Sequence, residues 1–270
     1  MADGGILAHR EEAVLWLTID RPQVGNALRP QDRLELVDRL SAADDDASIR
    51  CVVLTGTGDA FCTGADLRSS AGPPPRPPGA PDKIAGDVAR NIRKNAQLLI
   101  STILELEKPV VAAVNGTAAG LGFHLAIACD LVVAVEGTRF IEVFVRRGLV
   151  ADGGGAYLLP RMVGLQRAKE LMFLGDDLSA ESARDMGLVN RVVPRDRFDE
   201  EVRTLASRLA SGPTRALALM KWLANRSLDT DRQTMFENES YAQDINMTTA
   251  DGAEGVASFL ARRPPEYRGW

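Results

Sequence analysis

One segment of the chain constrains its fold more than any other: residues 108–130, KPVVAAVNGTAAGLGFHLAIACD. Its apolar beginning predicts a buried strand over 110–114, and its apolar end predicts a helix that begins near Ala119. A glycine-bearing turn joins the two, so the first N–H groups of the helix point outward without partners. The positive end of the helix dipole favours negative charge at the same place. The segment therefore predicts an anion site where a strand meets a helix.

A second glycine-rich turn, GTGDAFCTGADL over 56–67, follows another predicted strand over 49–55. Two such turns can supply two converging backbone N–H donors, which is the arrangement of an oxyanion hole. We therefore expect a site that stabilises an enolate or a similar oxyanion.

The composition is that of a globular chain with a sizeable core: 270 residues, of which 45% are hydrophobic and 26% charged. A chain of this length is often one α/β domain with a smaller appendage. The net charge is −5, and Lys and Arg are interspersed with Asp and Glu, which argues against nucleic acid as the main partner.

The N-terminus has no basic start followed by a long apolar run, and no apolar run reaches the ~20 residues of a membrane-spanning helix. We expect a cytoplasmic protein that has no membrane partner. The cysteines Cys51, Cys62 and Cys129 are odd in number and lack the Cys-x-x-Cys or Cys/His spacing of a metal site. We expect them to be buried core residues, with neither a disulfide framework nor a bound metal.

Strand and helix patterns alternate along the chain up to about residue 196. Strands are expected at 13–20, 49–55, 110–114 and 131–135, and helices after Pro30, over 88–106, over 166–174 and over 180–186. From Phe198 onward the pattern is helical almost throughout, with breaks at Gly212-Pro213 and around Asp251-Gly252. This order predicts an α/β fold with a catalytic core over 1–196 and a helical C-terminal subdomain over 197–270.

The segment 69–83, SSAGPPPRPPGAPDK, is too rich in Pro and Gly for a helix or a central strand. It directly follows the second glycine turn, which favours a mobile loop over the site, since long structureless loops in compact domains are usually functional or disordered. A polyproline II ligand for a partner domain is the alternative. Whether residues 71–81 become ordered on ligand binding stays open.

Several motifs together resemble the crotonase, or enoyl-CoA hydratase/isomerase, superfamily over nearly the whole chain. They are the 108–130 segment, RPQVGNAL (21–28), FCTGADL (61–67), GLVADGGGAYLLPRMVG (148–164), ARDMGLVNRVVP (183–194) and GVASFLARRP (255–264). A glycine-rich turn alone occurs in many folds, so the signal lies in the combination. The resemblance implies a crotonase-like spiral of β-β-α units with a helical C-terminal trimerisation region. It also implies a homotrimer or a dimer of trimers that acts on coenzyme A thioesters, with no other cofactor.

By the same resemblance, the two oxyanion-hole N–H groups belong to Ala65 and Leu121. The family usually has glycine where Leu121 stands; a leucine keeps the N–H but adds bulk near the acyl group. The residues that the resemblance assigns to binding of coenzyme A or the acyl group are Asn26, Ala27, Leu28, Thr63, Gly64, Asp66, Leu67, Gly120, Phe144, Phe259 and Arg262. The alternative for Phe259 and Arg262 is a core aromatic and a solvated charge.

Hydratases of this family use two glutamates, and the matching positions here hold His124 and Phe144. Adding water across a double bond needs a group that deprotonates water and a means of protonating C2, so the loss of both carboxylates should severely damage hydration. Glu142 has suitable chemistry but lies two positions before Phe144, and we expect it to point elsewhere.

Asp152 stands where isomerase-type and dehalogenase-type members of the family also place an aspartate. One carboxylate is sufficient for a 1,3 proton shift: it takes a proton from C2 or C4, the oxyanion hole holds the dienolate, and the proton returns at the other end. Apolar neighbours should desolvate the carboxyl group and raise its pKa. The alternative is that Asp152 caps the helix that follows Gly153.

His124 lies three residues after Leu121, so on a helix it shares a face with the oxyanion donor. It is either a second acid/base group or a neutral, satisfied histidine. We expect an enoyl-CoA isomerase with Asp152 as its proton carrier. Two other hypotheses stay open: an enoyl-CoA hydratase that uses Asp152 and His124, and a non-catalytic acyl-CoA-binding or assembly protein.

Overall fold

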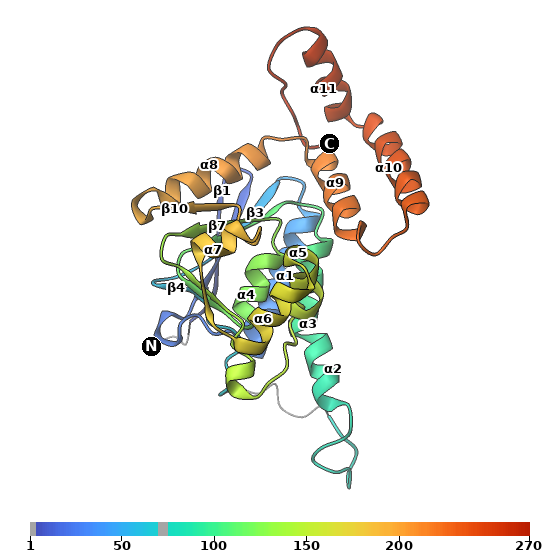
Figure 1. Cartoon of the computed structure of the whole chain (residues 1–270). Coiled ribbons are helices and arrows are strands. Elements are labelled where there is room, and N and C mark those ends of the chain that lie inside the picture. Colours follow the sequence, from blue (N-terminus) through green and yellow to red (C-terminus); the bar gives the residue numbers. More distant parts are fainter. Residues whose placement is uncertain (1–3, 70–74) are drawn as a thin grey trace.

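The computed structural model describes residues 4–69 and 75–270 (Figure 1). Its larger sheet has six strands in the order β1-β2-β3-β5-β7-β10. The strands are β1 (Gly5–Glu11), β2 (Val14–Asp20), β3 (Cys51–Gly56), β5 (Val110–Val114), β7 (Leu131–Val135) and β10 (Arg191–Val193). β1 and β2 form an antiparallel hairpin, and all other neighbours in this sheet are parallel.

A second, four-stranded sheet has the order β4-β6-β8-β9. Its strands are β4 (Ala60–Cys62), β6 (Thr117–Ala119), β8 (Arg139–Ile141) and β9 (Asp177–Ser179). β4, β6 and β8 each follow a strand of the larger sheet after a short turn, and a helix comes next in the chain. This repeat is the spiral of β-β-α units that the family resemblance implies, and the α/β class is confirmed.

Helices cover both faces of the larger sheet. Side chains of β3 and β5 alternate between two apolar clusters, one under α1, α3 and α4 and the other under α8, as the period of a strand requires. The helices around the spiral are α1 (Pro30–Asp45), α2 (Asp87–Lys94), α3 (Ala96–Glu105), α4 (Leu121–Ala128), α5 (Gly155–Val163), α6 (Leu165–Leu174), α7 (Ala180–Asp185) and α8 (Phe198–Ala210). Three short 3-10 helices, η1 (Pro22–Val24), η2 (Val145–Arg147) and η3 (Arg195–Arg197), lie between them.

The segment 108–130 is the centre of the structure. Every residue of β5 and of α4 is buried, which explains its nearly continuous apolar sequence. The helix begins at Leu121 and not near Ala119, because residues 117–119 first form β6. Gly120 then turns the chain with a φ of +53°, and its N–H donates to Ile141 O at 2.9 Å.

The single helix expected over 88–106 is wrong, since α2 and α3 are separated at Asn95. This residue is buried with φ −134° and ψ −85°, and its Nδ2 donates to Pro30 O at 3.0 Å. Asn95 thus forms a hydrogen bond to α1 and does not adopt a helical conformation. The sequence pattern also missed β1 and the short strands of the second sheet, which are too brief to show a period.

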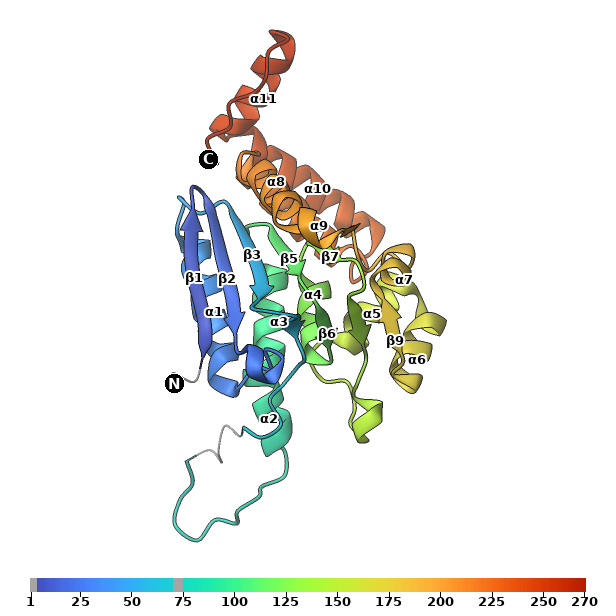
Figure 2. The same ribbon diagram turned by 90° about the vertical axis from the view of Figure 1, so that its left-hand side faces the viewer.

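The C-terminal region consists of α8 and of α9 (Thr214–Arg226), α10 (Arg232–Met247) and α11 (Ala250–Leu260), the last three of which project from the body (Figure 2). The expected break at Gly212-Pro213 is confirmed. The second break lies earlier than expected, because Thr249 Oγ1 accepts from Gly252 N at 2.9 Å and begins α11 there. None of the helices in the described ranges is long and apolar enough to cross a membrane.

Lys221 fastens α9 to the spiral. Its ammonium group donates to Ile103 O at 2.8 Å and pairs with Asp130 Oδ2 at 2.8 Å, while that oxygen also accepts from Val110 N at 2.7 Å. The Lys221 side chain is only 8% exposed. The ion pair therefore joins the C-terminal helices to the start of β5.

We expect Lys221→Met to lower the free energy of unfolding by about 3 kcal/mol, because it leaves the Asp130 carboxylate without its cation. Adding Asp130→Asn should recover part of this loss. Urea unfolding followed by circular dichroism measures both effects, with the exposed Lys169→Met as control. A loss no larger than that of the control would contradict the role of this pair.

Candidate active site

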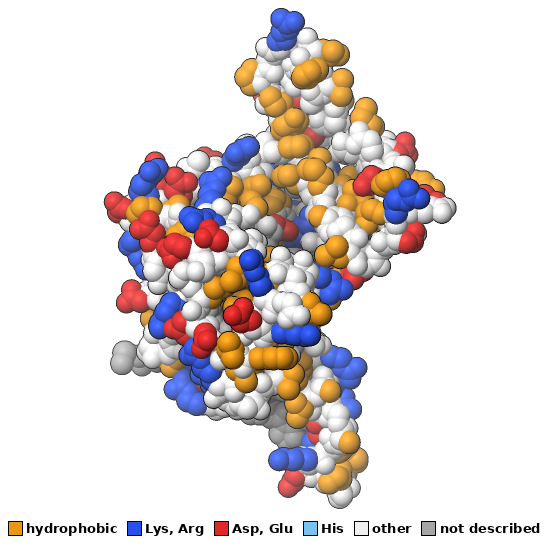
Figure 3. All heavy atoms as spheres, in the orientation of Figure 1, with side chains coloured by type: hydrophobic (Ala, Val, Ile, Leu, Met, Phe, Trp, Pro, Cys, Tyr) orange, Lys and Arg blue, Asp and Glu red, His pale blue; other side chains and the backbone are white. Residues whose placement is uncertain are grey.

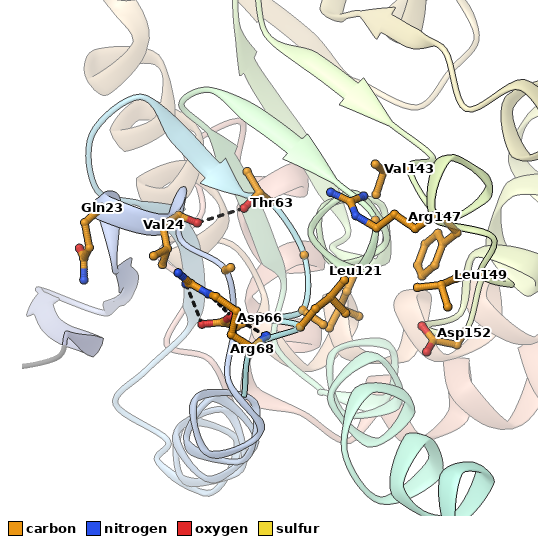
Figure 4. A pocket seen from close by; sticks show the side chains of 16 residues that line it. Gln23, Val24, Thr63, Asp66, Arg68, Leu121, Val143, Arg147, Leu149 and Asp152 are labelled. Atoms are coloured by element: carbon orange, nitrogen blue, oxygen red, sulfur yellow. Dashed lines mark hydrogen bonds and ion pairs between the residues drawn. The ribbon is translucent and has the colours of Figure 1, made fainter. Parts of the chain in front are cut away.

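A cavity of about 430 Å³ opens where the two glycine turns meet (Figure 4). One wall comes from η1 and the turn after β4, and the other from the start of α4 and the loop over 143–152. The lining residues are Gln23, Val24, Ala27, Thr63, Gly64, Ala65, Asp66, Leu67, Arg68, Gly120, Leu121, Val143, Phe144, Arg147, Leu149 and Asp152.

The two turns approach so closely that only glycine fits between them. A Cβ on Gly64, whose φ is +104°, would lie 2.9 Å from Ala119 O and 3.4 Å from Leu121 N. A Cβ on Gly122 would lie 2.0 Å from Cys62 O. These contacts bring the N–H groups next to each glycine to the same part of the cavity.

Ala65 and Leu121 carry those N–H groups, and both residues line the cavity. Within residues 4–69 and 75–270, neither N–H has a hydrogen-bond partner. Leu121 is the first residue of α4, so its N–H has no acceptor inside the helix. The structure thus contains the pair of free donors that the two turns predict.

Asp66 lines the cavity but is held by arginines. Hydrogen bonds from Arg68, at 3.0 Å, and from Arg21, at 3.2 Å, lower the pKa of this carboxyl to about 2. Asp66 is therefore a permanent carboxylate whose charge is compensated. It stabilises the turn that presents Ala65.

The predicted binding residues at 26–28 divide into two kinds. Ala27 lines the cavity, whereas Asn26 and Leu28 are fully buried and do not. Asn26 Nδ2 donates to Thr57 O at 2.9 Å and to Ala60 O at 2.7 Å. Leu28 N donates to Gly64 O at 2.8 Å. In this structure both residues fix the position of the second turn.

Asp152 projects toward the cavity beside Leu149, opposite Asp66 (Figure 4). Burial raises the pKa of its carboxyl group, and the positive charge of Arg33 partly opposes this effect. The helix-capping alternative is wrong, because α5 begins at Gly155 after Gly154, with no side-chain cap. Asp152 therefore contributes no cap to α5.

His124 and Glu142 form a buried pair behind the cavity wall, and neither lines the cavity. His124 Nε2 lies 2.6 Å from Glu142 Oε1, and the imidazole stacks on the Phe144 ring at 5.2 Å between centroids. Phe144 itself lines the cavity. From the sequence we expected Glu142 to point elsewhere; it does not line the cavity, and it pairs with His124 instead.

Two predicted binding residues lie far from the cavity. Phe259 is 81% exposed on α11, so it is not a core aromatic, and Arg262 follows the end of that helix. Thr63, Gly64, Leu67 and Gly120 line the cavity as expected. Leu149, which we expected to be an apolar neighbour of Asp152, lines the same cavity. The sequence patterns did not indicate the other lining residues: Gln23, Val24, Arg68, Val143 and Arg147.

The proline-rich loop is described only in part, because residues 70–74 lie outside the described residues. Residues 75–86 contribute no lining side chain and extend beyond α2 (Figure 2). For this described part, the expectation of a loop over the site is not met.

The raised pKa of Asp152 predicts how stability depends on pH. The folded chain holds the proton of this carboxyl to a higher pH than the unfolded chain, so stability is lost as pH rises through the folded pKa. We expect Asp152→Asn to raise the free energy of unfolding at about pH 8 and to change it little near pH 4. Urea unfolding at both pH values measures this, with the exposed Asp185→Asn as control. Lower stability of the variant at the higher pH would refute the assigned burial cost.

Comparison with known proteins agrees with this architecture. A family model described as enoyl-CoA hydratase/isomerase matches residues 9–269. The chain is 36% identical over 264 residues to the 1,2-epoxyphenylacetyl-CoA isomerase of Escherichia coli (strain K12), and 98% of each chain is covered. It is 37% identical over 258 residues to a probable enoyl-CoA hydratase of Rhodobacter capsulatus, covering 96% of this chain and 95% of the relative.

The crystal structure of a putative enoyl-CoA hydratase from Streptomyces coelicolor A3(2) superposes with a TM-score of 0.89 at 35% identity, covering 98% of this chain and 94% of that one. These matches extend over both glycine turns, the loop of Asp152 and the C-terminal helices. The protein is thus an enzyme of the crotonase superfamily, the acyl-CoA-processing family of enoyl-CoA hydratases and isomerases.

Proposed function

We propose that the protein is an enoyl-CoA isomerase that moves a double bond by a 1,3 proton shift, with Asp152 as the proton carrier. The observation that carries this proposal is the contrast between two carboxylates. Among the described residues that line the cavity, Asp66 and Asp152 are the acids, and Asp66 is engaged by Arg21 and Arg68. Asp152 is the one left to exchange a proton with a substrate.

The proposed mechanism uses the two free N–H groups first. The thioester carbonyl oxygen of the substrate accepts hydrogen bonds from Ala65 N and Leu121 N, and these donors stabilise the charge that develops on it. Asp152 removes a proton from C2 or C4, which leaves a dienolate, and then returns the proton at the other carbon. Its raised pKa suits a group that must both accept and donate a proton. The proposed reaction needs no cofactor, since the proton taken is the proton returned.

The two walls of the cavity support separate positions for the coenzyme A part and the acyl part of the substrate. We assign coenzyme A to Ala27 and the turn over 63–68, and the acyl group to Leu121, Phe144 and Leu149 on the opposite wall. The leucine at 121 narrows the acyl side, so the acyl group is expected to be slender near its thioester.

Some relatives are named isomerases and others hydratases, so their names do not distinguish between the two reactions. The residues favour the isomerase. Phe144 lines the cavity where the family's hydratases have a glutamate, and its ring cannot transfer a proton. The second candidate is a hydratase that uses Asp152 and His124, which the closeness of the His124–Glu142 pair to the cavity wall supports. The buried free thiols of Cys51, Cys62 and Cys129 support a reducing, cytoplasmic setting.

Asp152→Asn should reduce exchange of the C2 and C4 protons of a 3-enoyl-CoA in deuterated buffer by about 10²–10⁴-fold, because the proton carrier is lost. Proton NMR measures the exchange, and the surface variant Asp185→Asn is the matched control. Retained exchange in a folded Asp152→Asn protein would refute the isomerase. Rapid addition of water to crotonyl-CoA that is lost in His124→Ala would favour the hydratase instead.

We further propose that α9, α10 and α11 build a homotrimer, or a dimer of trimers. Hydrophobic side chains gather on these helices (Figure 3). The exposed ones include Met220, Trp222, Phe236, Tyr241, Ile245, Val256, Phe259 and Leu260. An apolar surface of this extent on projecting helices favours burial against another copy. In such an assembly we expect Phe259 and Arg262 to approach the site of a neighbouring copy.

Sedimentation equilibrium should give a mass at least three times that of the 29.1 kDa chain. Phe236→Asp should dissociate the assembly, because a charge on the apolar face of α10 is costly to bury. The exposed Glu237→Asp, next to it on α10, is the control and should leave the mass unchanged. A monomer for the unmodified chain would refute the proposal.

A further inference from the structure

Arg147 is a cation in the cavity wall that the proposed reaction does not use. It lines the cavity together with Phe144 and Leu149. In Figure 4 its side chain extends from the loop over 143–152 toward the middle of the cavity. Arg68 also lines the cavity, but its guanidinium pairs with Asp66 at 3.0 Å. The two lining arginines therefore differ, because the charge of Arg68 is compensated inside the chain.

Within residues 4–69 and 75–270, the guanidinium of Arg147 forms neither an ion pair nor a hydrogen bond. The adjacent Arg146 instead pairs with Asp177 at 2.7 Å and does not line the cavity. Of two consecutive arginines, the one that reaches the cavity is thus the one without an acid. A guanidinium is a planar fork of donors that matches the two oxygens of a carboxylate. An anion in the cavity would therefore find a free partner in Arg147.

The backbone of the loop places Arg147 between two apolar lining residues. Phe144 O accepts hydrogen bonds from Arg147 N at 2.9 Å and from Leu149 N at 3.0 Å. Gly148 turns the chain between them with a φ of +63°. One carbonyl oxygen thus gathers an aromatic ring, a guanidinium and an aliphatic side chain in one wall. Such a wall suits an apolar chain that carries an anionic end, since few polar groups among apolar ones fix the orientation of a ligand.

Two parts of a coenzyme A thioester can carry negative charge: the phosphates of coenzyme A and a carboxylate on the acyl group. We assign coenzyme A to the turn over 63–68, on the far side of the cavity. Arg147 belongs to the same wall as Leu121, Phe144 and Leu149, to which we assign the acyl group. This position favours the acyl carboxylate over the phosphates.

We propose that Arg147 binds a free carboxylate at the far end of the acyl group, so that the substrates are thioesters of dicarboxylic acids. The inference rests on the proposed function, in which the acyl group lies along this wall. The pair between Arg147 and the carboxylate sets how far the acyl chain enters the cavity, and thereby which carbons lie next to Asp152. Arg147 is thus a specificity-determining residue that takes no part in moving the proton.

Saturated thioesters test this binding without the reaction, because they have no double bond to move. Three pairs are matched in carbon number: succinyl-CoA with butyryl-CoA, glutaryl-CoA with pentanoyl-CoA, and adipyl-CoA with hexanoyl-CoA. In each pair a carboxylate replaces a terminal methyl group. We expect the dicarboxylic member of at least one pair to bind the unmodified protein about tenfold more tightly, as measured by titration calorimetry.

Arg147→Met removes the charge but keeps an apolar side chain of similar length. It should abolish the preference for the dicarboxylic member and leave the affinity for the monocarboxylic member unchanged. Arg147→Lys should retain part of the preference, because the ammonium group keeps the charge but loses the planar fork. Arg146→Met is the matched control: it removes the same charge from the same loop, and Asp177 keeps Arg139 at 2.9 Å. This control should keep the full preference, and circular dichroism confirms folding of each variant.

Two results with Arg147→Met or the unmodified protein would overturn the inference. One is an equal weakening by Arg147→Met of both members of every pair and of free coenzyme A, which would place the phosphates at Arg147. The other is the absence of any preference in the unmodified protein. Loss of the preference in Arg146→Met would likewise overturn it, since general attraction by positive charge would then explain the binding.

The proposed isomerase can fail separately. Retained proton exchange in Asp152→Asn would refute that reaction, whereas the binding of saturated thioesters involves no turnover. A preference that depends on Arg147 would therefore stand without the isomerase, and its absence would leave the isomerase intact. The two failures are distinguishable.

Discussion

The site depends on one steric constraint, the contact between the turn after β4 and the start of α4. Gly122 lies against Cys62 O, and Gly64 lies against Ala119 O, at separations where no Cβ fits. Any larger residue would push the turns apart and separate the N–H groups of Ala65 and Leu121. Because both turns follow strands that pair in parallel, the sheet fixes their spacing and the glycines fix their approach. Oxyanion stabilisation requires donors that are already in place, and this contact provides them.

Two carboxyl groups in one cavity then acquire opposite properties from their surroundings. Asp66 faces arginine side chains, which lower its pKa to about 2, so it is a fixed charge that supports the turn. Asp152 is desolvated by burial and forms no ion pair within the described residues, so its pKa is raised. This difference supports the two proposed roles, a structural one for Asp66 and proton transfer for Asp152. Asp152 is thus an unfavourable charge in the folded state, as expected where function competes with stability.

The sequence predicted the features that rest on local pattern. The apolar runs of β5 and α4 and the glycines at 64 and 122 identify the donor turns, because these signals depend on neighbouring residues alone. The break at Asn95 was not predictable, since it follows from a hydrogen bond to Pro30 O on a distant helix. The two side chains on the opposite wall, Val143 and Arg147, likewise enter the site through the path of the loop after β8. Tertiary contacts set these features, and periodicity does not encode them.

The His124–Glu142 pair illustrates the same limit at the level of chemistry. In the sequence, His124 stands where the family's hydratases have one glutamate, and Glu142 lies two positions before the place of the other. The sequence alone gives no sign that the two residues interact. In the fold the two meet at 2.6 Å, and glycines at 153 and 155 leave the space that they occupy. A carboxylate and an imidazole from different elements thus form one buried pair behind the cavity wall. Because the pair is buried, its hydrogen bond lies at low dielectric and is stronger than that of a surface pair would be. The sequence does not show this pair, because its two residues meet only in the folded chain, where α4 lies against the loop after β8.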